Sequence, residues 1–275
     1  MTQIGRSRSL FAVPVPAAGG RRAAADTIVT LGWAARTDTG RIRAANEDSY
    51  LAKSPVFAVA DGMGGHAAGD FASASVVTRL AEATLSDLVT PEDIDRSLRA
   101  AVADIERGTE GSDRSTGTTV TGAALTVLGG EPYWAVFNIG DSRVYQYAAG
   151  RLTQLTVDHS IVQELVDAGV ISRDEAETHP HSNVITRAVG FNDVPVPDYR
   201  LIPVAADSRL LICSDGLTKE LTDAGLLSIL AGGAAADVTA EALVDAALGN
   251  GGRDNVTVVV VDVLSVVAAE AVAPL

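Results

Sequence analysis

Three aspartates lie beside short apolar segments of the chain, and each has a glycine or asparagine next to it. They are Asp61-Gly62 after residues 56–60, Asp215-Gly216 after residues 210–214, and Asp254-Asn255 before residues 256–261. Apolar runs of this length and β-branched content are typical of buried strands, so we expect all three carboxylates at strand ends. Carboxylates that converge repel one another unless a cation lies between them, which predicts a metal site.

Oxygen ligands narrow the choice of metal. Glu47 and Asp48 add a further acidic pair, whereas the chain has no Cys-x-x-Cys motif and no histidine pair at metal-binding spacing. Zinc is therefore not expected. Mg²⁺ and Mn²⁺ both accept sites made of oxygen, and the sequence leaves the choice between them open. Two such ions that share one carboxylate would make a water between them nucleophilic near neutral pH.

Arg43 lies four residues before Glu47. A guanidinium beside a metal site can bind a phosphate group through its planar fork. Other phosphate chemistries lack their motifs, because neither Lys53 nor Lys219 follows a glycine and Cys213 is not followed by the arginine of a cysteine phosphatase loop. There is also no Gly-x-Ser-x-Gly elbow. Metal-assisted hydrolysis of a phosphate ester remains.

Composition limits the partners and the location. The chain has 275 residues, 47% of them hydrophobic, and a formal net charge of −14, which argues against nucleic acid or an anionic membrane as a partner. No apolar stretch reaches the about 18 residues of a membrane helix, so no membrane contact is expected. Cys213 is the only cysteine, which excludes an internal disulfide and favours a cytoplasmic protein. Nothing in the sequence indicates an oligomer, and we expect a monomer.

The apolar periodicity predicts strands and helices in blocks. Three consecutive strands are expected at residues 118–128, 133–139 and 142–147, and their tight connections predict that they are antiparallel neighbours. Helices are expected at residues 67–88 and after Thr90. This order favours an α+β sandwich with antiparallel sheets over a doubly wound parallel sheet.

The expected organisation is one catalytic domain between two tails. Residues 1–26 are rich in Arg, Ala, Gly and Pro without periodicity, which predicts a flexible N-terminal tail. Residues 27–265 are expected to form a single domain, in which the irregular polar stretch at about 159–194 has the features of a surface flap. Residues 266–275 are expected to be a C-terminal tail.

Eight motifs occur in order along the chain. They are R-x-D-x-G-x-x-R-x-x-NEDS (36–49), DGMGGH (61–66), GTT (117–119), NIGDSRVY (138–145), DHS (158–160), ITRAVG (185–190), SDGL (214–217) and GRDNVT (252–257). Together they resemble the bacterial metal-dependent serine/threonine protein phosphatases of the PPM, or type 2C, family, from about Leu31 to about Val263. The resemblance implies two stacked antiparallel β-sheets flanked by helices on both sides, with metals at one end of the sandwich.

The resemblance also implies roles for individual residues. Asp61 would bridge two metal ions, the Gly62 carbonyl and Glu47 would serve the second ion, Asp215 and Asp254 would complete the first, and Asp158 would join Asp215 at a third. Arg43 would bind the substrate phosphate. Arg43, Glu47, Asp48 and Asp61 are the expected catalytic residues.

The function implied is hydrolysis of phosphoserine and phosphothreonine by a metal-bridging water or hydroxide, with two or three Mn²⁺ or Mg²⁺ ions. The expected substrates are proteins that a bacterial serine/threonine kinase has phosphorylated. Two alternatives stay open: a catalytically silent relative that binds phosphoproteins, and a phosphatase of a small phosphate ester. Met63 replaces a histidine that donates a proton in many relatives, which leaves a metal-bound water or His66 as proton donor.

Overall fold

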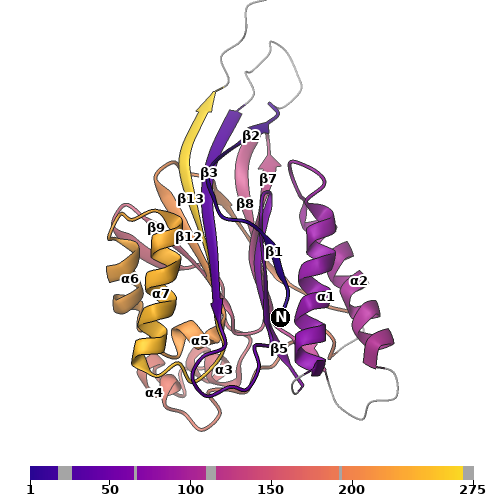
Figure 1. Ribbon diagram of the computed structural model, residues 1–275, viewed down its shortest axis with the longest axis vertical. Coiled ribbons are helices and arrows are strands. Elements are labelled where there is room, and N and C mark those ends of the chain that lie inside the picture. The colour runs from indigo at the N-terminus through magenta and orange to yellow at the C-terminus, as the bar shows by residue number, and fades with distance from the viewer. Residues whose placement is uncertain (18–26, 65–66, 110–115, 192–193, 269–275) are drawn as a thin grey trace, which may run out of the picture.

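The computed structural model describes residues 1–17, 27–64, 67–109, 116–191 and 194–268. Two β-sheets face each other, with helices α1 and α2 against the outside of one sheet and helices α6 and α7 against the outside of the other (Figure 1). The predicted α+β sandwich with helices on both sides is confirmed. None of the helices in the described ranges combines the length and apolar character needed to cross a membrane.

The first sheet contains β1 (Gln3–Gly5), β4 (Asp48–Lys53), β5 (Val56–Met63), β7 (Val120–Leu128), β8 (Glu131–Ile139) and β11 (Asp198–Pro203) in this spatial order, with β6 (Gly117–Thr118) beside β5. The second contains β10 (Arg151–Gln154), β9 (Arg143–Ala148), β12 (Ser208–Cys213), β13 (Val256–Ala268), β3 (Thr27–Asp38) and β2 (Arg8–Val15). The β1–β4 pair is parallel. The helices are α1 (Ala67–Ala83), α2 (Pro91–Thr109), α3 (Ile161–Asp167), α4 (Arg173–Glu177), α5 (Asp215–Thr218), α6 (Asp223–Leu230) and α7 (Ala236–Asn250).

Strand β13 explains why some segments read as continuous apolar runs. Val259 and Val261 belong to the cluster between the two sheets, whereas Val258 and Val260 pack with residues of α6 and α7. All four side chains are fully buried. Since alternate residues point to opposite faces, a strand covered on both sides must be apolar at every position. The strand ends are therefore visible in the sequence.

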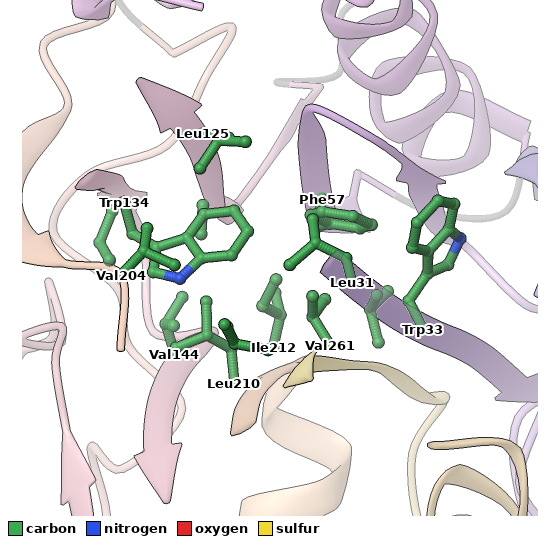
Figure 2. Packing of buried hydrophobic residues seen from close by; sticks show 14 of the residues in the cluster. Leu31, Trp33, Phe57, Leu125, Trp134, Val144, Val204, Leu210, Ile212 and Val261 are labelled. Carbon is green, nitrogen blue, oxygen red and sulfur yellow. The ribbon is translucent and has the colours of Figure 1, made fainter. Parts of the chain in front are cut away.

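The core between the sheets is built around aromatic side chains (Figure 2). Trp33 of β3 lies edge-on to Phe57 of β5 with ring centroids 5.2 Å apart, and Phe57 lies edge-on to Trp134 of β8 at 6.1 Å. Edge-on pairs at such distances are favourable for aromatic rings. This packing fixes one sheet against the other, and hence the relative positions of the strand ends that carry the acids.

The N-terminal segment differs from the expected flexible tail. Strand β1 pairs with β4 and strand β2 pairs with β3, so each sheet gains one edge strand. Val13 and Val15 are buried in the core between the sheets, because the alternation in β2 turns them to its inner face. The indole Nε1 of Trp33 donates to the carbonyl oxygens of Arg6 and Ala52, both at 3.0 Å.

The two predicted tails thus contribute to the domain. Residues 1–15 supply two strands, and residues 18–26 of the expected tail lie outside the described residues. Strand β13 continues to Ala268, past the predicted domain end at residue 265, because its last residues pair with the start of β3. Residues 269–275 are likewise outside the described ranges.

One predicted strand lies in the other sheet. β7 and β8 form the expected antiparallel pair, but β9 pairs with β10 and β12 instead of β8. Gly140, whose φ is +111°, connects the end of β8 to the loop that leads into β9. A left-handed conformation of this kind is readily accessible to glycine. The short connection therefore crosses from one sheet to the other, and it carries Asp141 to the end of the sandwich.

Trp33 and Trp134 offer a matched test of the attachment of the N-terminal strands. Trp33→Phe removes a donor that contacts two carbonyls, whereas the Trp134 Nε1 is buried with no hydrogen-bond partner among the described residues. We expect Trp33→Phe to lower the free energy of unfolding by about 1 to 2 kcal/mol more than Trp134→Phe. Urea denaturation of both variants measures the difference, and an equal loss would contradict the role of Trp33.

Candidate active site

The predicted acids meet at one end of the sandwich. Asp61 lies near the end of β5, Asp215 opens α5 directly after β12, and Asp254 precedes β13, so both sheets contribute to this end (Figure 1). Burial raises the pKa of Asp61 well above its usual value, and the carboxylates of Asp48, Asp215, Asp141 and Asp254 raise it further. The structure therefore brings together the acids that the sequence places at separate strand ends.

The backbone on both sides of the Asp61 carboxylate is fixed by the Gly-Thr-Thr segment. The Asp61 carbonyl accepts hydrogen bonds from the Thr119 amide and the Thr118 hydroxyl, both at 2.9 Å. The Asp61 amide donates to Thr119 Oγ1 at 3.1 Å, and that hydroxyl also contacts Ser142 Oγ at 2.8 Å. Thr119 thus connects the end of β5 to the loop that carries Asp141.

Gly62 and Glu47, the predicted ligands of the second metal, lie close to each other beside Gly69. A Cβ atom on Gly62 would collide with the Gly69 carbonyl and approach the Glu47 carbonyl to 2.6 Å. A Cβ atom on Gly69 would collide with the Glu47 carboxylate. Only glycine allows these three segments to approach so closely.

Asn255 holds the loop that carries Arg43 and Glu47. Its Nδ2 donates to the carbonyls of Thr39 at 2.8 Å and Ala45 at 3.0 Å, and its Oδ1 accepts from the Glu47 amide at 2.9 Å. No role for Asn255 follows from the sequence alone. The feature of the sequence that could have indicated this role is an asparagine directly after an acid at the start of a strand. Its side-chain amide can form hydrogen bonds with several backbone groups of a loop.

Asp48 bridges the two sheets beneath the site. It is fully buried at the start of β4, and its Oδ2 accepts from Ser214 Oγ at 2.9 Å, just after β12 of the opposite sheet, and from Thr257 Oγ1 of β13 at 2.6 Å. Burial raises the pKa of Asp48 to about 7, with smaller contributions from Asp215 and Asp254. We expected Asp48 among the catalytic residues, but this environment suits a positioning role.

Two cationic side chains contact the predicted ligands of the first metal. Arg43 holds both oxygens of Asp254, with Nε 2.9 Å from Oδ1 and Nη2 3.0 Å from Oδ2. Lys219 forms an ion pair with Asp215, and its Nζ lies 3.3 Å from Asp254 Oδ2. The sequence offers one sign of the Lys219 contact, because Lys219 follows Asp215 by four residues and such residues are neighbours on a helix.

Asp158, the predicted ligand of a third metal, and Asp141 both lie close to charged groups of the site. Asp158, expected at a third metal site, accepts from Arg143 Nη2 at 2.7 Å and Nε at 3.0 Å, and from Gln154 Nε2 at 3.1 Å. Asp141, which reads as a turn residue, lies among the site acids. Burial raises the pKa of Asp141 to about 8, and Asp215 and Asp158 add to this effect.

The donor set fits a hard cation. Asp48 Oδ1 and Asp215 Oδ1 are buried without a hydrogen-bond partner among the described residues, and such oxygens are costly unless something pairs with them. Within the same ranges, no three His, Cys, Asp or Glu side chains form a group that would hold a metal as they stand. In this arrangement Arg43 contacts Asp254, and Lys219 contacts both Asp215 and Asp254.

The flap is anchored at its base. His159 is buried, its Nδ1 accepts from the Gly140 amide at 3.1 Å, and its own amide donates to the Gly140 carbonyl at 2.8 Å. Its Nε2 lies 3.1 Å from Asp198 Oδ2, and Arg187 donates to the other oxygen of Asp198 at 2.9 Å. The flap is thereby tied to the Asp141 loop. His66, the other candidate proton donor, lies outside the described residues.

Known proteins that are similar to this chain in sequence and in fold share a common description. A family model described as protein phosphatase 2C matches residues 43–246. The chain is 41% identical over 246 residues to the serine/threonine protein phosphatase PstP of Mycobacterium tuberculosis, a match that covers 86% of the chain and 46% of that relative. It is 35% identical over 240 residues to the serine/threonine phosphatase stp of Listeria innocua, which covers 82% of the chain and 94% of that relative.

Solved structures agree. The crystal structure of M. tuberculosis PstP/Ppp superposes with a TM-score of 0.78 at 39% identity, covering 86% of this chain and all of that one. The catalytic domain of PstP in complex with two manganese ions gives the same TM-score at 38% identity, with coverage of 86% and 99%. The chain spans 46% of the length of the PstP relative. The family model, the relatives and the fold agree with the motifs, and this chain belongs to the protein phosphatase 2C family.

Proposed function

We propose that this chain is a metal-dependent serine/threonine protein phosphatase. The observation that carries the proposal is the convergence of Asp61, Asp215 and Asp254 at one end of the sandwich, with Arg43 beside them. The M. tuberculosis and Listeria relatives are named serine/threonine phosphatases, which supports the same reaction here.

Two divalent ions, Mn²⁺ or Mg²⁺, would be held by the residues that the resemblance selects. Asp215 and Asp254 would hold the first ion, Asp61 would bridge both, and the Gly62 carbonyl and Glu47 would serve the second. The PstP catalytic domain with two manganese ions supports this number. For a third ion we propose Asp141 instead of Asp158, because Asp141 lies beside the site acid Asp215, whereas both oxygens of Asp158 accept hydrogen bonds from Arg143 and Gln154. Bound ions would neutralise phosphate charge and activate a water for attack.

Arg43 would bind the phosphate of the substrate. Its side chain is 53% exposed, and its fork already holds a planar anion, the Asp254 carboxylate, through two parallel hydrogen bonds. The same geometry matches two phosphate oxygens. In this role Arg43 orients the phosphorus atom toward the acids, and its charge stabilises the negative charge that develops during transfer.

The remaining residues of the site keep the reacting groups in place. Asn255 fixes the loop of Arg43 and Glu47, Thr119 fixes Asp61, and Asp48 joins the two sheets. A positioning network of this kind lowers the barrier because misplacement by about 1 Å costs a large part of the rate.

We propose that the substrates are proteins phosphorylated by a bacterial serine/threonine kinase. We also propose that this chain acts on them in the cytoplasm as a monomer. Exposed apolar side chains on and beside the flap would contact the polypeptide around the phosphorylated residue; they are Val170, Val184, Phe191, Val194 and Val196. The net charge of −14 supports a protein partner over a nucleic acid. A silent phosphoprotein-binding relative is not favoured, because the predicted metal ligands are all present.

Phosphate release from a phosphothreonine peptide tests the function. We expect turnover with Mn²⁺ or Mg²⁺, none with chelator, and a loss of at least about a hundredfold in Asp61→Asn, since removing the shared carboxylate disrupts both metal positions. Asp87→Asn, at an exposed position outside the site, is the control. Turnover in the presence of chelator, or wild-type rates in Asp61→Asn, would contradict the proposal. Higher turnover of a small aryl phosphate than of the peptide would favour the small-ester alternative.

Asp141→Asn and Asp158→Asn separate the two candidates for the third metal. We expect Asp141→Asn to raise the Mn²⁺ concentration that half-saturates turnover while the protein stays folded. Asp158→Asn leaves the mostly buried Arg143 guanidinium without its partner carboxylate and should lower the free energy of unfolding by about 3 kcal/mol. Metal titration and urea denaturation of both variants check this, and the opposite pattern would restore Asp158 as the ligand.

Arg43→Lys tests the phosphate fork against simple charge. Lysine keeps the charge but loses the two parallel donors, so we expect KM for a phosphopeptide to rise by roughly tenfold or more. Arg41→Lys is the matched control, because Arg41 lies on the same loop and its guanidinium contacts the Leu248 carbonyl instead of an acid. Steady-state kinetics measure both variants. Equal KM values for Arg43→Lys and the wild type would show that the fork does not bind substrate.

A further inference from the structure

The site contains one cation that no step above uses. The chain has only two lysines, Lys53 and Lys219. Lys53 is exposed at the end of β4, whereas the Lys219 side chain is 33% exposed and turned toward the acids. Its Nζ forms an ion pair with Asp215 Oδ2 and lies 3.3 Å from Asp254 Oδ2. The ammonium group therefore touches both carboxylates proposed to hold the first metal.

The charge of Lys219 is maintained by its surroundings. A lysine side chain is protonated at neutral pH, and the ion pair with Asp215 and the contact with Asp254 favour its charged form. A permanent positive charge thus lies at the two proposed ligands of the first metal. An ammonium and a divalent ion on the same carboxylate oxygens would be only about 4 Å apart and would repel each other strongly.

We propose that Lys219 is a tethered competitor of the first metal ion. It pairs with Asp215 and Asp254 until a divalent cation displaces it, and so it sets the metal concentration at which the enzyme becomes active. The inference rests on the proposed metal site. A lysine suits this task because its compact charge ends a flexible four-carbon chain that can swing away without moving α5.

The displacement would also affect Arg43. Asp254 gives one oxygen to Arg43 Nε and the other to both Arg43 Nη2 and Lys219. A metal that takes Asp254 as a ligand competes with both cations for these oxygens. The Arg43 side chain, which is 53% exposed, is then free to turn its fork to a phosphate group. Metal binding would in this way prepare the phosphate site, because the same carboxylate restrains both cations.

Calorimetric titration of Mn²⁺ into the full chain, stripped of metal by chelator, tests the proposal without relying on turnover. We expect Lys219→Gln and Lys219→Met to lower Kd for the tightest site by roughly tenfold or more, because the competing charge is gone. Lys219→Arg keeps the charge and should keep the wild-type Kd within a few fold. Lys53→Gln removes the other lysine of the chain, outside the acid cluster, and should leave Kd unchanged.

Thermal unfolding of the same proteins, with and without Mn²⁺, provides a second test. Without metal, Lys219→Gln leaves Asp215 and Asp254 less neutralised, so its Tm should fall below that of the wild type. Saturating Mn²⁺ should raise its Tm by more than it raises the wild-type Tm, because a tighter ligand stabilises more at equal concentration. A lower Tm without metal, together with a larger increase of Tm on addition of Mn²⁺, distinguishes competition from a general loss of stability.

The outcomes separate this inference from the proposed function. Unchanged or weaker Mn²⁺ binding in both Lys219→Gln and Lys219→Met overturns the competition, even if the protein is an active phosphatase. One additional Mn²⁺ bound at an unchanged Kd for the first site also overturns it, because Lys219 would then replace a third ion. If the folded wild-type chain binds no Mn²⁺, the metal site itself is disproved, and both this inference and the proposed function are overturned.

Discussion

The crowding of carboxylates at one end of the sandwich determines how the rest of the site is built. Burial raises the pKa of both Asp61 and Asp141. Asp141, Asp215 and Asp254 lie close enough to Asp61 to raise its pKa further, and Asp215 also raises the pKa of Asp141. Like charges in a low-dielectric environment are tolerated only with compensating positive charge. The protein supplies part of that compensation itself through Arg43 and Lys219, and such tethered cations are exchangeable for metal ions.

The crowding depends on keeping two sheets in fixed alignment, because the acids come from both. Asp61 belongs to the first sheet, and Asp215 and Asp254 adjoin strands of the second. The aromatic core sets the spacing of the sheets along their length, and Asp48 sets it at the site through hydrogen bonds to Ser214 and Thr257. Joining two sheets through a buried carboxylate costs free energy, because the charged group loses its contact with water. Its position beneath the site makes it useful, since it fixes polar segments that apolar packing could not hold.

The site acids were predictable to the extent that their strands were. Asp61, Asp215 and Asp254 adjoin strands buried on both faces, and a continuous apolar run shows where such a strand ends. Asp141 was missed because a two-residue connection looks the same whether it closes a hairpin or crosses to another sheet. The choice depends on which strands β9 meets in space, which no local pattern contains. The pairing of Asp158 with Arg143 is equally a tertiary contact, invisible from their spacing in the chain.

Several strands could be located from their periodicity, but the first two could not, and the reason is their position at the edges of the sheets. Phe11, Val13 and Val15 alternate as a half-buried strand should, yet Pro14 and Pro16 interrupt the pattern and argue for a loop. An edge strand tolerates proline, because one side of its backbone has no partner to receive a hydrogen bond. In β2, Pro14 pairs with Ile28 of β3 while its neighbours Val13 and Val15 enter the core. A proline in a short alternating segment therefore excludes a central strand, and the choice between an edge strand and a tail depends on whether a sheet edge lies within reach.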